Sequence, residues 1–214
     1  GVTPRTVYQN LAIELMFDPS IDIVTVISQA GYGKTFLALA CAIDLVLMKK
    51  QHFEKIYIVK PNVEIGEKLG YLPGEIEEKL NPYFKPIEEL ILKLHSARPA
   101  NRFFTESTAG KVRLDPKKCE ILPMNFLRGM NLENCIVIID EAQNLTRLQT
   151  RTLLTRMGHF VKCFVLGDIN QVDHPYLNRY NNGLNWIVKK FKGFHNYGHI
   201  VLKGAKSRGP ITDM

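Results

Sequence analysis

The sequence predicts an α/β fold of three layers, in which a mainly parallel sheet lies between two layers of helices. Two observations lead to this prediction. Apolar runs of about five residues, typical of strands buried on both faces, alternate with segments of helical spacing. One of these runs, residues 23–27, leads through a glycine-rich turn into a helical segment, which is the layout that a nucleotide phosphate needs.

The individual elements follow from periodicity and from the residues that end them. Asp18-Pro19 ends the first helix, and Pro61 ends the second strand. Helical spacing covers residues 7–16, 34–48, 75–94 (interrupted near Pro82 and Pro86), 145–157 and 184–191. Strands are predicted over residues 23–27, 55–59, 120–122, 125–128, 135–139, 161–166 and 199–202, and residues 95–118 are predicted to be a loop. Since the middle of the chain does not alternate, we expect a single domain over residues 1–214 with an insertion at about 62–130.

The glycine-rich turn is the run Ile27-Ser-Gln-Ala-Gly-Tyr-Gly-Lys-Thr35. Backbone N–H groups of such a turn wrap an anion, Lys34 would reach the β- and γ-phosphates, and the Thr35 hydroxyl would reach Mg²⁺. The strict pattern has glycine where this chain has Ser28. The residues expected to contact ATP are Ala30, Gly31, Tyr32, Gly33, Lys34, Thr35 and Phe36.

A second polar motif, Asp140-Glu-Ala-Gln143, follows the buried run 135–139. It lies at the carboxyl end of a strand, where α/β proteins bind their ligands. Asp140 is expected to hold Mg²⁺, directly or through water, and Glu141 to polarise the attacking water. Gln143 is a candidate sensor of the γ-phosphate.

A third motif, Gly167-Asp-Ile-Asn-Gln171, also follows a buried run. Asp168 is either functional or a structural turn cap. Gln171 is expected to contact both the γ-phosphate and Asp140, and thereby to link the nucleotide state to a neighbouring surface.

Composition narrows the class of protein and of partner. The net charge of +7 favours a polyanionic partner beyond ATP, although the basic residues are dispersed. The four cysteines lie far apart in or beside apolar segments, which predicts reduced core thiols in a cytoplasmic protein. No apolar run reaches the roughly 18 residues of a membrane span, and no signal peptide is recognisable, so no membrane association is expected.

The three motifs, in this order, resemble motifs I, II and III of superfamily 1 helicases, which have the P-loop NTPase (RecA-like) fold. Further segments resemble the PhoH (phosphate starvation-inducible) ATPases, and this resemblance covers residues 9–213. These segments are Val59-Lys-Pro-Asn-Val-Glu-Ile-Gly66, Leu69-Gly-Tyr-Leu-Pro-Gly74, Glu78-Lys-Leu-Asn-Pro-Tyr83, Phe126-Leu-Arg-Gly129, Asp140-Glu-Ala-Gln-Asn-Leu-Thr146, Thr155-Arg-Met-Gly158 and Asn182-Gly-Leu184.

The resemblance implies a cytoplasmic ATPase that uses ATP and Mg²⁺, with single-stranded RNA as its substrate. It also implies a homo-oligomer, often a ring such as a hexamer. The opening over residues 18–26 most resembles the form that carries an N-terminal PIN ribonuclease domain. We therefore expect either the ATPase part of such a protein or a stand-alone relative.

Several residues keep alternative roles. Gln9 matches a glutamine that reads adenine in related helicases, but a helical glutamine is more often exposed at the surface. Tyr32 stands where the family has a small residue, and we favour packing over stacking on the base or ribose. The family's late arginine corresponds to Arg208, with Lys206 as the alternative, and would stabilise transition-state charge.

Four residues that match family elements have side chains suited to a nucleic-acid backbone. The alternative for each is an ordinary surface salt bridge. They are Lys60, Asn62, Arg128 and Arg156.

Two functions from different classes are consistent with these motifs. One is an RNA-dependent ATPase or helicase motor, which would need assembly because the chain has length for only one core. The other is a nucleotide-binding regulatory or assembly module with little turnover.

Overall fold

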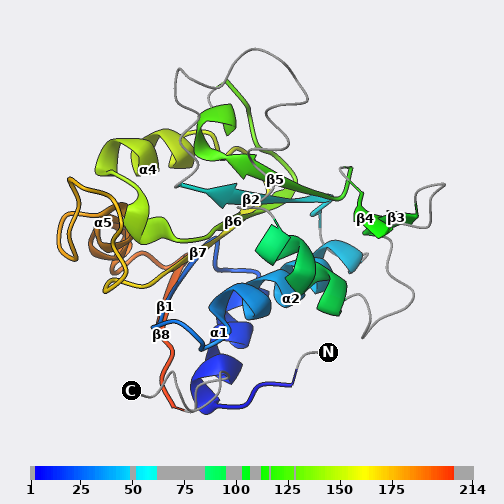
Figure 1. Cartoon of the computed structure of the whole chain (residues 1–214), viewed down its shortest axis with the longest axis horizontal. Helices are drawn as coiled ribbons and strands as arrows, with labels where there is room; N and C mark the ends of the chain where they lie inside the picture. The colour runs from blue at the N-terminus through cyan, green and yellow to red at the C-terminus, as the bar shows by residue number, and fades with distance from the viewer. Residues whose placement is uncertain are drawn as a thin grey trace.

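The centre of the fold is a parallel sheet. The computed structural model describes residues 3–48, 52–61, 85–94, 103–106, 112–115, 117–127 and 129–204. In this part of the chain, six strands form one sheet in the order β5-β2-β6-β7-β1-β8, and every neighbouring pair is parallel (Figure 1). The strands are β1 Ile23–Ile27, β2 Lys55–Lys60, β5 Cys119–Pro123, β6 Cys135–Ile139, β7 Val161–Gly167 and β8 Tyr197–Val201. The predicted α/β fold is therefore confirmed.

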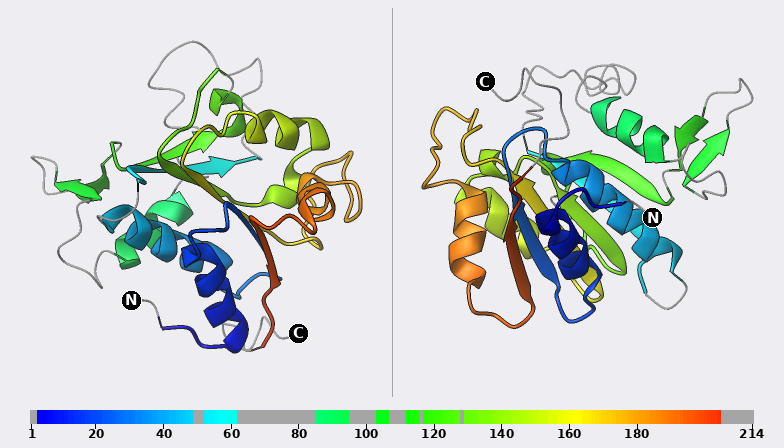
Figure 2. Two further views of the ribbon diagram at one scale, coloured as in Figure 1. Left: turned by 180° about the vertical axis from the view of Figure 1, so that it is seen from behind. Right: turned by 90° about the horizontal axis from the view of Figure 1, so that it is seen from below.

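Helices cover both faces of the sheet and create two separate cores (Figures 1 and 2). On one face pack α1 (Val7–Phe17), α2 (Lys34–Leu47) and the helical residues 85–94. The other face is covered by α4 (Arg147–Leu154) and α5 (Gly183–Phe191). Because side chains alternate along a strand, each buried strand supplies both cores. None of the described helices is long and apolar enough to cross a membrane.

Capping residues set where the helices begin. The Thr6 hydroxyl accepts a hydrogen bond from the Gln9 backbone N–H at the start of α1. Thr146 and Gln149 form a reciprocal capping box at the start of α4, and Asn182 caps α5 through the Asn185 N–H. Each cap satisfies backbone donors that the first helical turn leaves without partners.

Three details differ from the sequence-based prediction. Residues 125–127 of the predicted strand 125–128 belong instead to the 3₁₀ helix η1, Met124–Leu127, in which Met124 and Leu127 are buried at a three-residue spacing. The predicted loop contains a hairpin of β3 (Phe104–Glu106) and β4 (Val112–Leu114). The predicted helix over 145–157 is shorter, since Thr146 caps it. Residues 75–84 lie outside the described part of the chain.

Part of the predicted insertion over residues 62–130 also contributes to the core. Strand β5 pairs with β2 at the edge of the sheet. The end of the predicted insertion over 62–130 is therefore part of the main sheet, because its apolar side chains complete one face of it.

The four cysteines are buried reduced thiols, as the sequence predicts. Burial raises the pKa of Cys119 and of Cys135 to about 12, and that of Cys163 further. The thiols therefore remain protonated at neutral pH and act as small apolar side chains.

Candidate functional site

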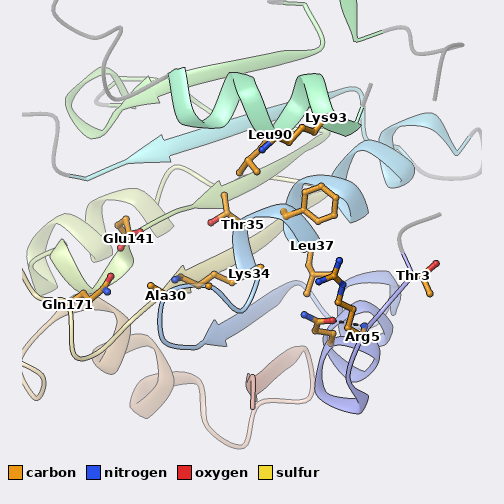
Figure 3. Close-up of a pocket in the computed structure, with 14 residues that line it drawn as sticks. Thr3, Arg5, Ala30, Lys34, Thr35, Leu37, Leu90, Lys93, Glu141 and Gln171 are labelled. Carbon is orange, nitrogen blue, oxygen red and sulfur yellow. Dashed lines mark hydrogen bonds between the residues drawn. The ribbon is translucent and has the colours of Figure 1, made fainter. Parts of the chain in front are cut away.

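A cavity of about 750 Å³ opens at the carboxyl edge of the sheet, where the phosphate-loop sequence meets the second and third polar motifs (Figure 3). Its lining comes from the segment before α1, the glycine-rich turn, helix α2, the helical residues 85–94 and the turns after β6 and β7. The residues are Thr3, Arg5, Gln9, Ala30, Gly31, Gly33, Lys34, Thr35, Phe36, Leu37, Leu90, Lys93, Glu141 and Gln171.

The glycine-rich turn has the backbone of a phosphate-binding loop. Gly31 and Gly33 have φ angles of 91° and 76°, in the left-handed region that favours glycine. Helix α2 begins directly after Gly33 without a side-chain cap, so its first N–H groups are available to an anion. Lys34 is 8% exposed and lines the cavity. Ser28 is not among the described residues with positive φ, so its backbone does not require the glycine of the strict pattern.

Thr35, which lines the cavity, contacts Asp140, so two side chains with oxygen atoms lie together at this point. The Thr35 hydroxyl donates to Asp140 Oδ1 at 3.1 Å, and Asp140 is 3% exposed. The other carboxylate oxygen, Oδ2, lies 2.7 Å from the Lys60 ammonium, so a cation already stands against this carboxylate. Mg²⁺ in phosphate sites takes one or two protein oxygens besides phosphate and water. The pair therefore fits the predicted Mg²⁺ site.

Glu141 turns sharply at the end of β6. Its φ of 57° and ψ of 41° place a non-glycine residue in the left-handed region, which costs about 1–3 kcal/mol. This turn directs the side chain to the cavity, where Figure 3 shows it near Gln171. Its carboxylate oxygen Oε2 accepts a hydrogen bond from Gln143 Nε2 at 2.6 Å.

Gln143 connects the second motif to the third. It is fully buried and does not line the cavity, so it does not occupy the position of the predicted γ-phosphate sensor. Its Nε2 also donates to the Gln171 carbonyl at 3.0 Å, and its Oε1 accepts from the Asp168 N–H at 3.0 Å. A Cβ at Gly167 would stand 2.6 Å from Gln143 Oε1, so this close approach requires glycine.

The third motif is a tight turn beside the cavity. The Asp168 carboxylate accepts from the Asn170 N–H at 2.9 Å, and this supports the turn-cap alternative for Asp168. Gln171 lines the cavity. Two residues further on, the Asp173 N–H donates to Asn144 Oδ1 at 2.8 Å. Two adjacent residues, Gln143 and Asn144, therefore hold the segment after β7.

The far end of the cavity is formed by Thr3 and Arg5, which precede α1, and by Gln9 in the first turn of α1. Gln9 is 6% exposed, and its Nε2 donates to the Tyr32 carbonyl at 3.1 Å. Gln9 therefore faces the phosphate loop rather than solvent. The Tyr32 side chain packs against the core cluster, which is the alternative favoured from the sequence.

Five cavity residues were missed in the sequence: Thr3, Arg5, Leu37, Leu90 and Lys93. Leu37 lies one turn into α2 and could have been found from helical spacing. The others come from segments without a phosphate-binding motif, and only the packing of α1 and residues 85–94 against α2 brings them here.

The predicted nucleic-acid residues do not gather at one place in the described structure. Lys60 is the last residue of β2 and pairs with Asp140. Arg156 lies before β7, and its carbonyl accepts from Leu132 N–H before β6, so it is at the amino edge, opposite the cavity. The other two nucleic-acid candidates, Asn62 and Arg128, lie outside the described residues. The same holds for the two candidates for the late arginine position, Arg208 and Lys206.

Comparison with known proteins places the chain in a family. The family profile described as PhoH-like protein matches residues 1–211. Protein PhoH2 of Bacillus subtilis is 39% identical over 213 residues, which are 97% of this chain and 46% of that protein. A PhoH-like protein of the same species is 37% identical over 181 residues, covering 85% of this chain and 52% of that protein. The chain thus spans about half the length of these curated relatives.

A solved structure supports the fold. The large terminase of bacteriophage HK97 superimposes with a TM-score of 0.54 over 97% of this chain and 41% of the terminase, at 15% sequence identity. This likeness concerns the fold of P-loop ATPases and not the activity. The match of the family profile over nearly the whole length shows that the chain belongs to the PhoH family.

Proposed function

We propose that this chain binds ATP with Mg²⁺ in the cavity at the carboxyl edge and hydrolyses it in a cycle coupled to single-stranded RNA. The observation that carries this proposal is the meeting of Lys34 and Thr35 with Glu141 and Gln171 around one cavity, with Asp140 against Thr35. A phosphate chain laid on the loop would pass between these side chains.

The protein groups divide the chemistry between them. Loop N–H groups and Lys34 would neutralise charge that develops on the β- and γ-phosphates. Mg²⁺ held by Thr35 and Asp140 would supply further positive charge at the phosphate oxygens. Glu141 would orient water and accept its proton, because its carboxylate borders the cavity and Gln143 fixes its position. Gln171 would hydrogen-bond the same water or the γ-phosphate.

Coupling to RNA is supported by the positive net charge and by the connection from Glu141 through Gln143 to the turn after β7. A motor built from single cores needs several copies, so we further propose that the chain assembles into a ring. Mass measurement in solution tests this assembly. The alternative of a regulatory module with little turnover predicts ATP binding without stimulation by RNA.

Nucleotide binding and hydrolysis are tested with two substitutions. Lys34→Ala should abolish binding of a non-hydrolysable ATP analogue in calorimetry, since it removes the lysine of the phosphate loop. Glu141→Gln keeps the size of the side chain, so binding should remain while turnover falls by roughly two orders of magnitude. Lys190→Ala, at an exposed position of α5, is the control and should retain parental binding and turnover.

The RNA part is tested by measuring turnover with and without oligouridylate, and by fluorescence anisotropy of the labelled oligomer. Stimulated turnover and salt-sensitive binding are expected. Unchanged affinity of Lys34→Ala for the ATP analogue would refute the nucleotide site. Absence of oligomer binding with and without nucleotide would leave the regulatory module as the better explanation.

A further inference from the structure

The segment between β7 and α5, residues 172–182, presents two tyrosines to solvent at the same edge of the sheet as the cavity. We call it the β7–α5 loop. Tyr176 is 85% exposed and Tyr180 is 66% exposed. In Figure 1 this loop, in yellow to orange, projects beside α5. Neither tyrosine belongs to the two buried cores, and the ring contacts of each are to a neighbouring residue of the same loop, so both rings are accessible to a partner.

The loop is held in one conformation by asparagine side chains. Asn178 Oδ1 accepts from the Tyr180 N–H at 2.8 Å and from the Asn181 N–H at 3.1 Å. Asn181 Oδ1 accepts from the Asn178 N–H at 2.6 Å. From the start of α5, Asn185 Nδ2 donates to the carbonyls of Arg179 and Tyr180 at 3.0 and 3.2 Å. These bonds hold the backbone of the loop and involve neither tyrosine hydroxyl, so both hydroxyls and ring faces stay open to solvent.

The chemistry around the rings suits nucleobases. The Arg179 guanidinium carbon lies 4.9 Å from the centre of the Tyr180 ring, and the His174 ring lies 6.0 Å from that of Tyr176. A hollow of about 600 Å³ beside Tyr180 is lined by residues that include Val172, Leu177, Arg179 and Tyr180 itself. Exposed aromatic rings with an adjacent arginine match what single-stranded nucleic acids need, because every base has a flat face and every nucleotide a phosphate.

The loop is also tied to the catalytic machinery. It follows Gln171, whose carbonyl accepts from Gln143, and its Asp173 N–H donates to Asn144. Gln143 in turn donates to Glu141. Hydrogen bonds therefore connect Glu141 through Gln143 to Gln171, the residue that precedes the loop. A movement of Glu141 around the γ-phosphate can be transmitted to the loop along this connection.

We propose that Tyr176 and Tyr180 form a stacking platform for the unpaired bases of single-stranded RNA, with Arg179 contacting its backbone. This rests on the proposed RNA-coupled function and gives that function a binding surface for bases. A protein partner is the alternative occupant of the same surface and would give a different outcome in the test.

The test compares two labelled twelve-residue oligomers, oligoadenylate and an abasic oligomer of equal charge, by fluorescence anisotropy. Tyr176→Ala and Tyr180→Ala should each weaken oligoadenylate binding about five- to a hundredfold and leave abasic binding unchanged. Tyr176→Phe and Tyr180→Phe keep the ring and should restore affinity. Phe194→Ala removes an exposed aromatic after α5 and is the matched control, expected to bind as the parent does.

The salt dependence separates stacking from charge. The tyrosine variants should keep the parental slope of log affinity against log salt, while Arg179→Ala should lower that slope by about one unit. Calorimetry with the ATP analogue checks that all variants remain folded and bind nucleotide.

The outcomes are distinct. If the parental protein binds neither oligomer, the RNA-coupled function and the platform both fail. If it binds oligoadenylate and the alanine variants bind equally well, the platform is refuted, a protein partner becomes the better occupant, and the RNA-coupled function stands.

Discussion

Gln143 should be decisive for both stability and turnover, although it does not line the cavity. We consider Gln143→Met, which keeps the approximate length of the side chain but removes all of its hydrogen bonds. The substitution leaves the Asp168 N–H without its acceptor and the Gln171 carbonyl and Glu141 carboxylate without their donor.

The magnitude follows from burial. Asp168 is 2% exposed and Gln143 fully buried, so water cannot replace the lost acceptor. Leaving the buried Asp168 N–H without an acceptor costs about 1–3 kcal/mol. Loss of the hydrogen bond to the Glu141 carboxylate adds only about 1 kcal/mol, because this carboxylate is partly exposed and water can partly replace the lost donor. The free energy of unfolding should fall by about 3 kcal/mol, which lowers the Tm by about 6–12 °C for a chain of this size.

Urea unfolding measures the loss of stability, and single-turnover hydrolysis measures the loss of Glu141 positioning. Gln143→Glu is the matched variant, because it keeps an acceptor for the Asp168 N–H but places a second carboxylate against Glu141. The reasoning is refuted if Gln143→Met unfolds at the parental urea concentration and hydrolyses ATP at the parental rate.

Three further predictions concern single positions. Ser28→Gly should change ATP affinity less than about threefold in calorimetry, since Ser28 does not need positive φ; a severe loss would show that its hydroxyl has a contact of its own. Lys60→Met should lower the Mg²⁺ concentration required for binding a fluorescent ATP analogue, because it removes the cation that competes for Asp140; an unchanged or higher requirement would contradict this. With pKa values of about 12, Cys119 and Cys135 should react with iodoacetamide at pH 8 only on unfolding, and rapid alkylation of the native protein would disprove their burial.

The α/β architecture and the residues at the centre of the candidate site could be predicted from the sequence. Apolar runs such as 135–139 indicate strands buried on both faces, and such strands form parallel sheets with helices outside. Parallel strands bring their carboxyl ends to one edge. The residues that follow three of these runs, Lys34, Asp140 and Gln171, were therefore expected near one another.

The sequence was less informative where packing overrides local pattern. The segment after Pro123 has strand-like composition but forms the helix η1, because the burial of Met124 and Leu127 selects a three-residue period. Arg156 matches a family element, yet the return from α4 to β7 carries it to the amino edge. Local composition does not determine these placements.

The side-chain contacts within the site are visible only in the folded structure. The pairing of Lys60 with Asp140 joins residues 80 positions apart, and the link from Gln143 to Asp168 joins residues 25 apart. No sequence motif predicts either contact, because each depends on the distance between neighbouring strand ends and on the conformations of the turns that follow. A sequence specifies such contacts only through the complete packing of the sheet. The contacts of Gln143 and Lys60 with the acidic motif therefore emerge with the fold.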